Sequence, residues 1–327
     1  MEKDLSPTLF VTGAAGFIGS HICDMLLESG HSVVGLDNFD PYYPRAEKEK
    51  NLRQGMKNAK FSLVEGDIRD AELVSTIFRK NSLSSVVHLA ARAGVRASLL
   101  EPEEFLDVNI RGTAVLLEAA RKAGVRDFIF ASSSSVYGDR SEVPFRESDR
   151  TDHPLSPYGA SKKAGEALCY TYHHLYGLSI ACLRFFTVYG PRQRPDLAIR
   201  KFTELALADR PIPVFGDGSS RRDYTHIRDI LSGVKGAMDW CTQSVQPRYG
   251  IFNLGSNSPV TLESLLQHLE EILQKPLQRD YHPPQPGDVF QTYADTTLAE
   301  SELGFRRTVS FKEGLADFCH WLIRQNE

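Results

Sequence analysis

The sequence predicts an α/β fold whose larger part is a doubly wound parallel sheet. In the first 185 residues, short apolar and β-branched runs alternate with longer stretches of helical periodicity. Such alternation is typical of βαβ units, in which the strands of one sheet run parallel. The runs are apolar at successive positions, as expected for strands that helices cover on both faces.

The expected elements follow this alternation in chain order. Strands are predicted over residues 9–12, 32–36, 61–65, 85–89, 128–132 and 180–185. Helical patterns lie between them, for example over residues 17–29, 105–123 and 158–176. We therefore predict that one domain occupies residues 1–185.

The pattern changes after residue 185, where prolines break the chain into shorter pieces joined by loops. This pattern favours a smaller, loop-rich α/β domain that binds substrate, which we place over residues 186–327. One more apolar run lies at residues 250–255. We expect it to form a strand that rejoins the first sheet, which would make the domains discontinuous.

Composition and charge argue against several classes of function. The 327-residue chain has a formal net charge of −4, so no overall basic surface indicates nucleic acid or an anionic membrane as a partner. No apolar run approaches the roughly 18 residues of a membrane helix, and the polar start lacks a signal-peptide pattern. The five cysteines are scattered without a CxxC pair, which favours reduced thiols over disulfides or a metal site. We expect a cytoplasmic protein without a bound metal.

A glycine loop follows the first expected strand and opens the first expected helix. Gly13, Gly16 and Gly19 have the spacing GxxGxxG, and Phe17 and Ile18 begin the helix. Glycine allows a tight turn, and bare backbone at a helix N-terminus can approach a pyrophosphate closely. This context predicts a Rossmann-type dinucleotide-binding domain in which these five residues contact the cofactor.

Acidic residues end the second and third expected strands. Asp37 can accept hydrogen bonds from the adenosine ribose hydroxyls and would repel a 2′-phosphate, which favours NAD over NADP. The alternative is that Asp37 is only a loop acid ahead of the turn that begins at Asn38. We expect Asn38 to lie beside the ribose, and Asp67 and Ile68 to reach the adenine edge.

A Tyr–Lys pair marks the candidate catalytic helix. Tyr158 and Lys162 lie one turn apart on the same face of a helix that Pro157 opens. A tyrosine base working near neutral pH needs a pKa well below about 10, and a neighbouring ammonium and a nicotinamide cation favour the charged form. Ser133, at the end of an expected strand, would bond the reacting oxygen of the substrate. The alternatives are an exposed helix pair and a solvated serine loop.

Together these motifs resemble the extended short-chain dehydrogenase/reductases, and within them the UDP-glucuronate 4-epimerases. The likeness covers nearly all of the chain. Its pieces are FVTGAAGFIGSH (10–21), LDNFDPYYP (36–44), VHLAARAGVRAS (87–98), ASSSSVYG (131–138), SPYGASKKAGE (156–166), LRFFTVYGPRQRPD (183–196), VFGDGSSRRDYTHI (214–227), NLG (253–255) and QPGD (285–288).

The resemblance implies an NAD-dependent cycle on a UDP-sugar and a homodimer built from the helices near 105–123 and 158–176. Tyr158 would take the proton from the sugar O4 while C4 passes hydride to NAD, and hydride would return to the opposite face of the 4-keto sugar. The implied cofactor contacts further along the chain are Leu89, Ala90, Ala91 and Asn109, and the implied substrate contacts include Arg96, Arg222 and Asp288.

Close relatives of this family differ at positions that the sequence allows us to compare. The 4,6-dehydratases carry an Asp-Glu pair where this chain has Ser134 and Ser135, and UDP-glucuronate decarboxylases carry a glutamate at the position of Ser135. Glucose-type epimerases have asparagine in place of Thr187. The resemblance therefore implies an epimerase that acts on a sugar acid.

A physical argument also favours the acid substrate. The 4-keto form of glucuronate is a β-keto acid, which loses CO₂ when its carboxylate bond aligns with the ketone π system. An epimerase must hold that carboxylate out of alignment, and Ser134, Ser135, Thr187 and Arg194 are suitable donors. The alternative is that Arg192 and Arg194 only bind the pyrophosphate.

Other functions remain open on the sequence alone. A UDP-glucose/galactose or UDP-N-acetylhexosamine 4-epimerase would need no carboxylate clamp, and a UDP-glucuronate decarboxylase would share most of the motifs. A protein that senses NAD without catalysis could have the same fold, although such proteins commonly lack the tyrosine or lysine that this chain keeps.

Overall fold

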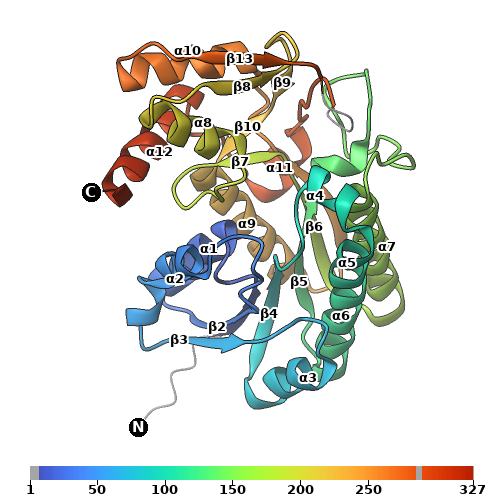
Figure 1. Cartoon of the computed structure of the whole chain (residues 1–327). Coiled ribbons are helices and arrows are strands. Elements are labelled where there is room, and N and C mark those ends of the chain that lie inside the picture. The colour runs from blue at the N-terminus through green and yellow to red at the C-terminus, as the bar shows by residue number, and fades with distance from the viewer. Residues whose placement is uncertain (1–6, 285–288, 327) are drawn as a thin grey trace.

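The centre of the molecule is a seven-stranded sheet in which every neighbouring pair of strands is parallel (Figure 1). The structure, a computed structural model, describes residues 7–284 and 289–326. The strand order is β11-β6-β5-β4-β1-β2-β3, so the order reverses beside β1. The strands are β1 (Thr8–Thr12), β2 (Ser32–Asp37), β3 (Phe61–Glu65), β4 (Leu83–His88), β5 (Asp127–Ser133), β6 (Ser179–Phe185) and β11 (Tyr249–Leu254).

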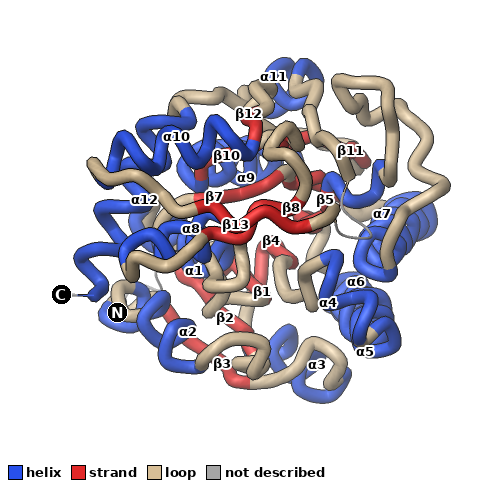
Figure 2. The backbone as a smooth tube through the Cα atoms, turned by 45° about the horizontal axis from the view of Figure 1, so that its top comes forward, coloured by secondary structure: helices blue, strands red, loops and turns tan. Residues whose placement is uncertain are grey.

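Helices cover both faces of this sheet, as Figures 1 and 2 show. Alternate strand residues enter two separate cores because successive side chains of a strand point to opposite faces. In β1, Leu9 and Val11 belong to the core with α1 and α9, whereas Phe10 belongs to the core with α3, α6 and α7. These helices and those beside them are α1 (Phe17–Glu28), α2 (Arg45–Leu52), α3 (Ala71–Lys80), α4 (Val95–Leu100), α5 (Pro102–Leu106), α6 (Gly112–Ala123), α7 (Pro157–Tyr176), α9 (Ile227–Thr242) and α11 (Thr297–Leu303).

The C-terminal half forms a smaller α/β layer, drawn at the top of Figure 1. It has its own core, in which Ile212 and Val214 of one strand pack against Leu266 and Phe318 of two helices. Its elements are β7 (Thr187–Tyr189), α8 (Ala198–Leu207), β8 (Ile212–Phe215), β9 (Arg221–Arg222), β10 (Tyr224–His226), β12 (Val260–Thr261), α10 (Leu262–Leu273), β13 (Arg279–His282) and α12 (Phe311–Asn326). The strand expected over residues 250–255 is β11, which pairs with β6 in the central sheet.

The helix expected over residues 105–123 is helical without a gap, but it is not α-helical throughout. It begins as α5, passes through one π-helical turn at Asp107–Arg111, and continues as α6. Such π turns are rare, and they often occur at functional sites. This turn carries Asn109, whose side-chain amide forms hydrogen bonds with the backbone of Arg92 and with the hydroxyl of Ser161.

No helix in the described part of the chain is long and apolar enough to span a membrane.

Candidate active site

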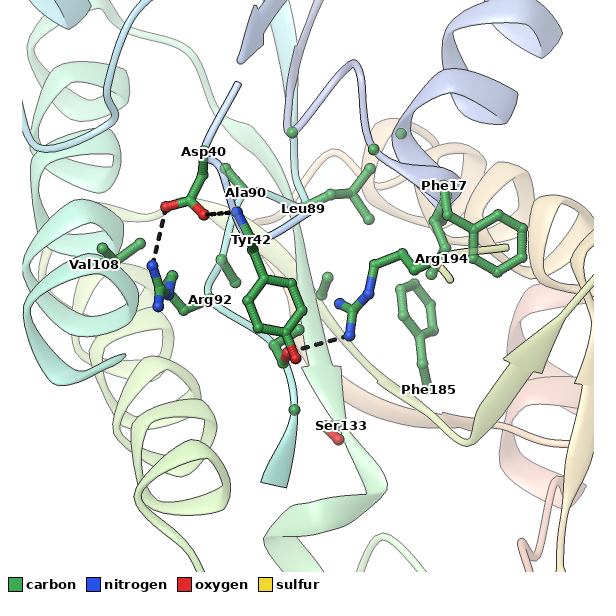
Figure 3. A pocket seen from close by; sticks show the side chains of 18 of the residues that line it. Phe17, Asp40, Tyr42, Leu89, Ala90, Arg92, Val108, Ser133, Phe185 and Arg194 are labelled. Atoms are coloured by element: carbon green, nitrogen blue, oxygen red, sulfur yellow. Dashed lines mark hydrogen bonds and ion pairs between the residues drawn. The ribbon is translucent and has the colours of Figure 1, made fainter. Parts of the chain in front are cut away.

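A cavity with a volume of about 460 Å³ opens at the carboxyl ends of the parallel strands. Open α/β sheets bind ligands at this edge, beside the point where the strand order reverses. Figure 3 shows the cavity with Arg92 and Tyr42 on one side and Arg194 and Phe185 facing them. The sequence-predicted residues that line it are Gly13, Gly16, Phe17, Ile18, Gly19, Asp37, Asn38, Asp67, Ile68, Leu89, Ala90, Ala91, Ser133, Ser134, Ser135, Tyr158, Lys162, Thr187 and Arg194.

The glycine loop brings backbone to the floor of this cavity. Gly13 has a φ of +69°, and a Cβ at Gly19 would lie 2.0 Å from the carbonyl oxygen of Gly13. Helix α1 follows directly, and its N-cap residue Gly16 offers no side-chain oxygen to the first helical N–H groups. These N–H groups and the positive end of the helix dipole can therefore interact with an anion.

Asp37 lies buried in the cavity wall, close to a cation. Its two oxygens accept hydrogen bonds from the backbone N–H of Ala15 at 3.0 Å and of Phe39 at 2.8 Å. Lys48 of α2 is equally buried, with Nζ 3.8 Å from the Asp37 carboxylate. Burial raises the pKa of Asp37, and the Lys48 ammonium opposes that shift.

The neighbouring acid, Asp67, is held by two side chains. Asn38 Nδ2 donates to it at 3.2 Å, and Arg69 Nη2 donates to it at 2.8 Å. Partial burial acts to raise the pKa of Asp67, but the hydrogen bonds from Arg69 lower it overall. Asp67 is therefore a fixed, charged acceptor at the cavity edge beside Ile68.

The candidate catalytic residues come from the end of β5 and the first turns of α7. The hydroxyl of Ser156 caps α7 by accepting from Gly159 N at 3.1 Å, so the helix begins one residue before Tyr158. The ring of Tyr158 packs edge-on against Phe105, with 6.3 Å between the ring centroids. Lys162 Nζ donates to the backbone oxygen of Ala131 at 2.8 Å.

The charges in this part of the site depend strongly on burial. Burial lowers the pKa of Lys162 to about 8. Burial raises the pKa of Tyr158, while a hydrogen bond with Ser133 and the positive charge of Arg194 act in the opposite direction. The protein groups around Tyr158 therefore do not by themselves lower its pKa below the usual value.

Arg194 reaches the same space from the segment after β7. Its Nε and Nη2 donate to the two oxygens of Asp196 at 2.9 and 2.8 Å, and Nη2 also donates to Ala93 O at 3.2 Å. The guanidinium lies 5.4 Å from the ring centroid of Tyr42, whose hydroxyl donates to Asp196 at 3.3 Å. These contacts, visible in part in Figure 3, link the two halves of the chain across the cavity.

Three hydroxyl side chains complete the wall near Tyr158. Ser134 and Ser135 lie in the 3₁₀ turn that follows β5, and Thr187 begins β7. Ser135 N donates to Ser133 Oγ at 3.1 Å, so the turn and the strand end are fixed to each other. Positions 134, 135 and 187 therefore present hydroxyl groups to this part of the cavity, and neither position 134 nor position 135 carries an acid.

Asn109 does not line the cavity but supports a loop that does. Its Nδ2 donates to Arg92 O at 3.0 Å and to Ser161 Oγ at 2.9 Å, and its Oδ1 accepts from Arg92 N at 2.8 Å. These bonds fix the loop after β4 to the catalytic helix. A direct contact of Asn109 with a cofactor stays a prediction.

Two of the predicted arginines also lie outside the lining residues. Arg192 forms an ion pair with Asp24 of α1 at 2.7 Å. The guanidinium of Arg96 lies over the ring of Phe215, 5.2 Å from its centroid. Their roles in substrate binding stay predictions.

The remaining predicted substrate contacts lie toward the C-terminal half. Arg222 Nη1 donates to the backbone oxygens of Arg221 at 2.9 Å and Phe290 at 3.2 Å, away from the cavity lining. Asp288, with the QPGD motif, lies outside the described residues.

Sequence reasoning missed several cavity residues. Tyr42, Lys48 and Arg92 all line the cavity without having been assigned a role. Tyr42 and Arg92 lie within the motifs at 36–44 and 87–98, so the signal was present, but a motif does not tell which of its side chains face inward. Lys48 has no motif of its own.

The fold and the site together define a short-chain dehydrogenase/reductase: a glycine loop, a buried acid after β2 and a Tyr–Lys helix on a doubly wound parallel sheet. The chain belongs to the NAD-dependent epimerase/dehydratase family, since the model described as GDP-mannose 4,6 dehydratase matches residues 10–318.

Individual relatives are similar over nearly the whole chain. UDP-glucuronate 4-epimerase 5 of Arabidopsis thaliana is 44% identical over 97% of this chain and 75% of its own length. The crystal structure of UDP-glucuronic acid 4-epimerase from Bacillus cereus, in complex with UDP-glucuronic acid and NAD, has a TM-score of 0.90 and 36% identity, covering 97% and 99% of the two chains. The UDP-glucose 4-epimerase of Thermotoga maritima, solved with UDP-glucose, has a TM-score of 0.89 and 35% identity, covering 98% and 100%.

Proposed function

We propose that this chain is an NAD-dependent 4-epimerase that interconverts UDP-glucuronate and UDP-galacturonate. The observation that carries the proposal is the wall around Tyr158, where Ser133 and Lys162 accompany the tyrosine and hydroxyl donors occupy positions 134, 135 and 187. The UDP-glucuronate 4-epimerases among its relatives support the choice of substrate.

The residues around the cavity fit NAD. The glycine loop packs closely against the chain after β4, since a Cβ at Gly13 would lie only 2.8 Å from Ala90 N, and it leaves bare backbone that a pyrophosphate can approach. The N-terminus of α1 suits its negative charge. Asp37 offers acceptor lone pairs to a ribose, because each carboxylate oxygen accepts more than the one backbone hydrogen bond it has here.

When bound, NAD supplies a hydride acceptor for C4 and a positive charge beside the tyrosine. Tyr158 Oη is then the group that takes the proton from the sugar O4, and it returns a proton to O4 when hydride comes back to C4. Ser133 donates to the same sugar oxygen and fixes its position. Lys162, with a pKa of about 8, keeps substantial positive charge near neutral pH and favours the phenolate.

The serine and threonine hydroxyls hold the sugar carboxylate in this proposal, with Arg194 as the charged donor. A dehydratase would need an acid at position 134 or 135 to remove water, and both residues are serine. The family description as a dehydratase therefore does not extend to the reaction that we propose.

A UDP-glucose/galactose 4-epimerase is the second candidate, because a structure of similar TM-score was solved with UDP-glucose. The two candidates differ in the need for carboxylate donors. Incubating the purified protein with UDP-glucuronate and UDP-glucose separately, and resolving the products by chromatography, tests both. We expect UDP-galacturonate from the first and at least about tenfold slower conversion of the second, since donors to a charged group contribute about 1.5–3 kcal/mol. Faster conversion of UDP-glucose would reject the acid substrate.

Cofactor preference provides a separate test of Asp37. We expect NAD to bind at least about tenfold more tightly than NADP, because a buried carboxylate repels a 2′-phosphate. Lys48 offsets part of that repulsion, so Asp37→Ser should weaken NAD binding and strengthen NADP binding. Fluorescence titration of the two reduced cofactors measures both constants. Equal affinities in the parent protein would reject the role of Asp37.

We also propose that the protein is a homodimer joined through the helices α5, α6 and α7. Tyr170, Leu175 and Tyr176 are exposed apolar residues of α7, as expected for a surface that a second copy covers. Light scattering on the eluted protein measures the mass, and a monomer at micromolar concentration would reject the proposal.

A further inference from the structure

A fully buried ion pair joins the helix that carries Tyr158 and Lys162 to the strand next to the one that ends in Ser133. Arg184 of β6 donates from Nε and Nη2 to the two oxygens of Glu166 of α7, at 2.8 and 2.9 Å. Each of the two side chains is only 1% exposed. Ser132 Oγ also donates to Glu166, at 2.7 Å. The Glu166 carboxylate therefore joins one helix and two adjacent strands at one point.

Each of these three residues is close in sequence to a residue of the site. Ser132 precedes Ser133 on β5, and it is paired in register with Arg184 on β6. Glu166 lies one helical turn beyond Lys162 and two turns beyond Tyr158 on α7. The ion pair thus fastens the catalytic helix to β6, and the hydrogen bond from Ser132 fastens the same carboxylate to β5, the strand that ends in Ser133.

The same ion pair also contacts the turn that carries the serine hydroxyls. The Arg184 guanidinium lies over the ring of Tyr137, 4.7 Å from its centroid, and Tyr137 belongs to the 3₁₀ turn after β5. The Tyr137 hydroxyl donates to Asn253 Oδ1 at 2.7 Å. Asn253 in turn donates to the backbone oxygen of Phe145 at 2.9 Å. The turn that holds Ser134 and Ser135 is therefore fixed through Tyr137, which contacts both Arg184 and Asn253.

Stability alone does not account for such a pair. Removing two charges from water costs free energy, and well-packed apolar side chains of similar volume are often as stabilising as a buried ion pair. What apolar side chains lack is direction: the two parallel hydrogen bonds of a guanidinium and a carboxylate fix both distance and angle. A small displacement at a catalytic group lowers turnover strongly.

We propose that Glu166 and Arg184 are positioning residues, which set the placement of Tyr158 and Lys162 on α7 relative to Ser133 on β5. The proposal rests on the proposed epimerase function, since it assigns these three groups to one reaction. It predicts that the pair acts on turnover and on the ionisation of Tyr158, whereas substrate binding depends on other residues.

The test replaces both charges at once, because a single replacement leaves a buried charge without a partner and destabilises the fold. We expect the double variant Glu166→Leu/Arg184→Met to fold, to keep its NAD and to have a KM near that of the parent. Its kcat should fall about 100-fold. The rise of kcat with pH should also move to higher pH, because the hydrogen bond from Ser133, which lowers the pKa of Tyr158, is lost or weakened.

A control removes a partly exposed ion pair outside the cavity lining. Arg279 of β13 and Glu270 of α10 are joined at 2.9 Å, and neither lines the cavity. The double variant Glu270→Leu/Arg279→Met should keep the kcat and the pH profile of the parent. If the Glu166/Arg184 variant folds, keeps its kcat within about threefold of the parent and shows the same pH profile, the inference is wrong.

Ser132→Ala keeps the test decisive if the double variant does not fold. This variant keeps the ion pair and removes one hydrogen bond, so we expect a smaller fall in kcat with the same direction of pH shift. Parental kinetics in Ser132→Ala, together with an unfolded double variant, would overturn the inference. All variants are compared on whichever UDP-sugar the parent converts, so a wrong substrate assignment appears in the parent and leaves this comparison intact.

Discussion

Replacing Tyr158 by phenylalanine is expected to lower kcat by about 10²- to 10⁴-fold, the range that positioned acid–base catalysis contributes. Phenylalanine keeps the ring that packs against Phe105 and removes only the hydroxyl that moves the proton. The NAD content of the purified protein should therefore stay that of the parent. Initial rates with UDP-glucuronate, together with the absorbance spectrum of released cofactor, measure both quantities.

Lys162→Met is the companion variant. We propose that Lys162 holds the nicotinamide ribose in addition to favouring the phenolate, so we expect lower turnover and weaker NAD retention together. A Tyr158→Phe protein with more than about a tenth of the parental rate would rule out Tyr158 as the base. Loss of NAD from Tyr158→Phe would instead indicate that the hydroxyl mainly binds the cofactor.

The strands were predictable because a parallel sheet with two covered faces leaves a strong pattern in the sequence. The run expected at residues 61–65 is β3 with the same bounds, and those at 32–36 and 180–185 are β2 and β6 within one residue. The helix at 105–123 was less predictable, since its periodicity continues through the π turn. In the π turn Asn109 contacts Arg92 and Ser161, and such tertiary contacts leave no local pattern in the sequence.

The candidate site was predictable where a residue type is tied to a local conformation. The glycines before α1 and the Tyr–Lys pair after Pro157 are of this kind, and all of them line the cavity. Lys48 and Tyr42 were missed because their places depend on how the loop after β2 folds over the cavity. The pair of Glu166 and Arg184 was missed for the same reason, because a contact between α7 and β6 has no local signature.

Arg194 shows how structure limits an interpretation from sequence. Its Nε and Nη2 are engaged by Asp196, whereas Nη1 takes part in none of those contacts. Arg194 lines the cavity, and its charge acts on Tyr158. Arg192, by contrast, lies against Asp24 and outside the lining residues. Of the two arginines, Arg194 is therefore the one that lines the cavity and acts on Tyr158, which supports it as the proposed carboxylate donor.

Arg194→Ala is expected to change the products of the reaction. If Arg194 and the hydroxyls of Ser134, Ser135 and Thr187 hold the carboxylate, the parent should convert UDP-glucuronate to UDP-galacturonate with little release of CO₂. Without the guanidinium, the C5–carboxylate bond of the 4-keto intermediate samples the alignment that permits decarboxylation. A hydrogen bond to a charged group contributes about 1.5–3 kcal/mol, so the ratio of epimerised to decarboxylated product should fall about 10- to 150-fold.

Mass spectrometry of the products separates the six-carbon acid from the five-carbon sugar that decarboxylation leaves. Arg194→Lys should give an intermediate ratio, because lysine keeps the charge but cannot form two parallel hydrogen bonds. Arg228→Ala is the control, since Arg228 is an exposed residue of α9 paired with Asp317. Oxidation at C4 should survive in all three variants because Ser133, Tyr158 and Lys162 are unchanged, but it should be slower in Arg194→Ala, where the charge that helps to lower the pKa of Tyr158 is lost.

The outcomes separate the two roles considered for Arg194. An unchanged product ratio in Arg194→Ala, with a raised KM, would mean that Arg194 binds the pyrophosphate and that the hydroxyls hold the carboxylate alone. A parent that prefers UDP-glucose would remove the reason for any carboxylate clamp. A five-carbon product that appears only when Arg194 is lost would show that the chain avoids decarboxylation by holding the intermediate in place, since decarboxylation of a β-keto acid itself requires no further catalytic group.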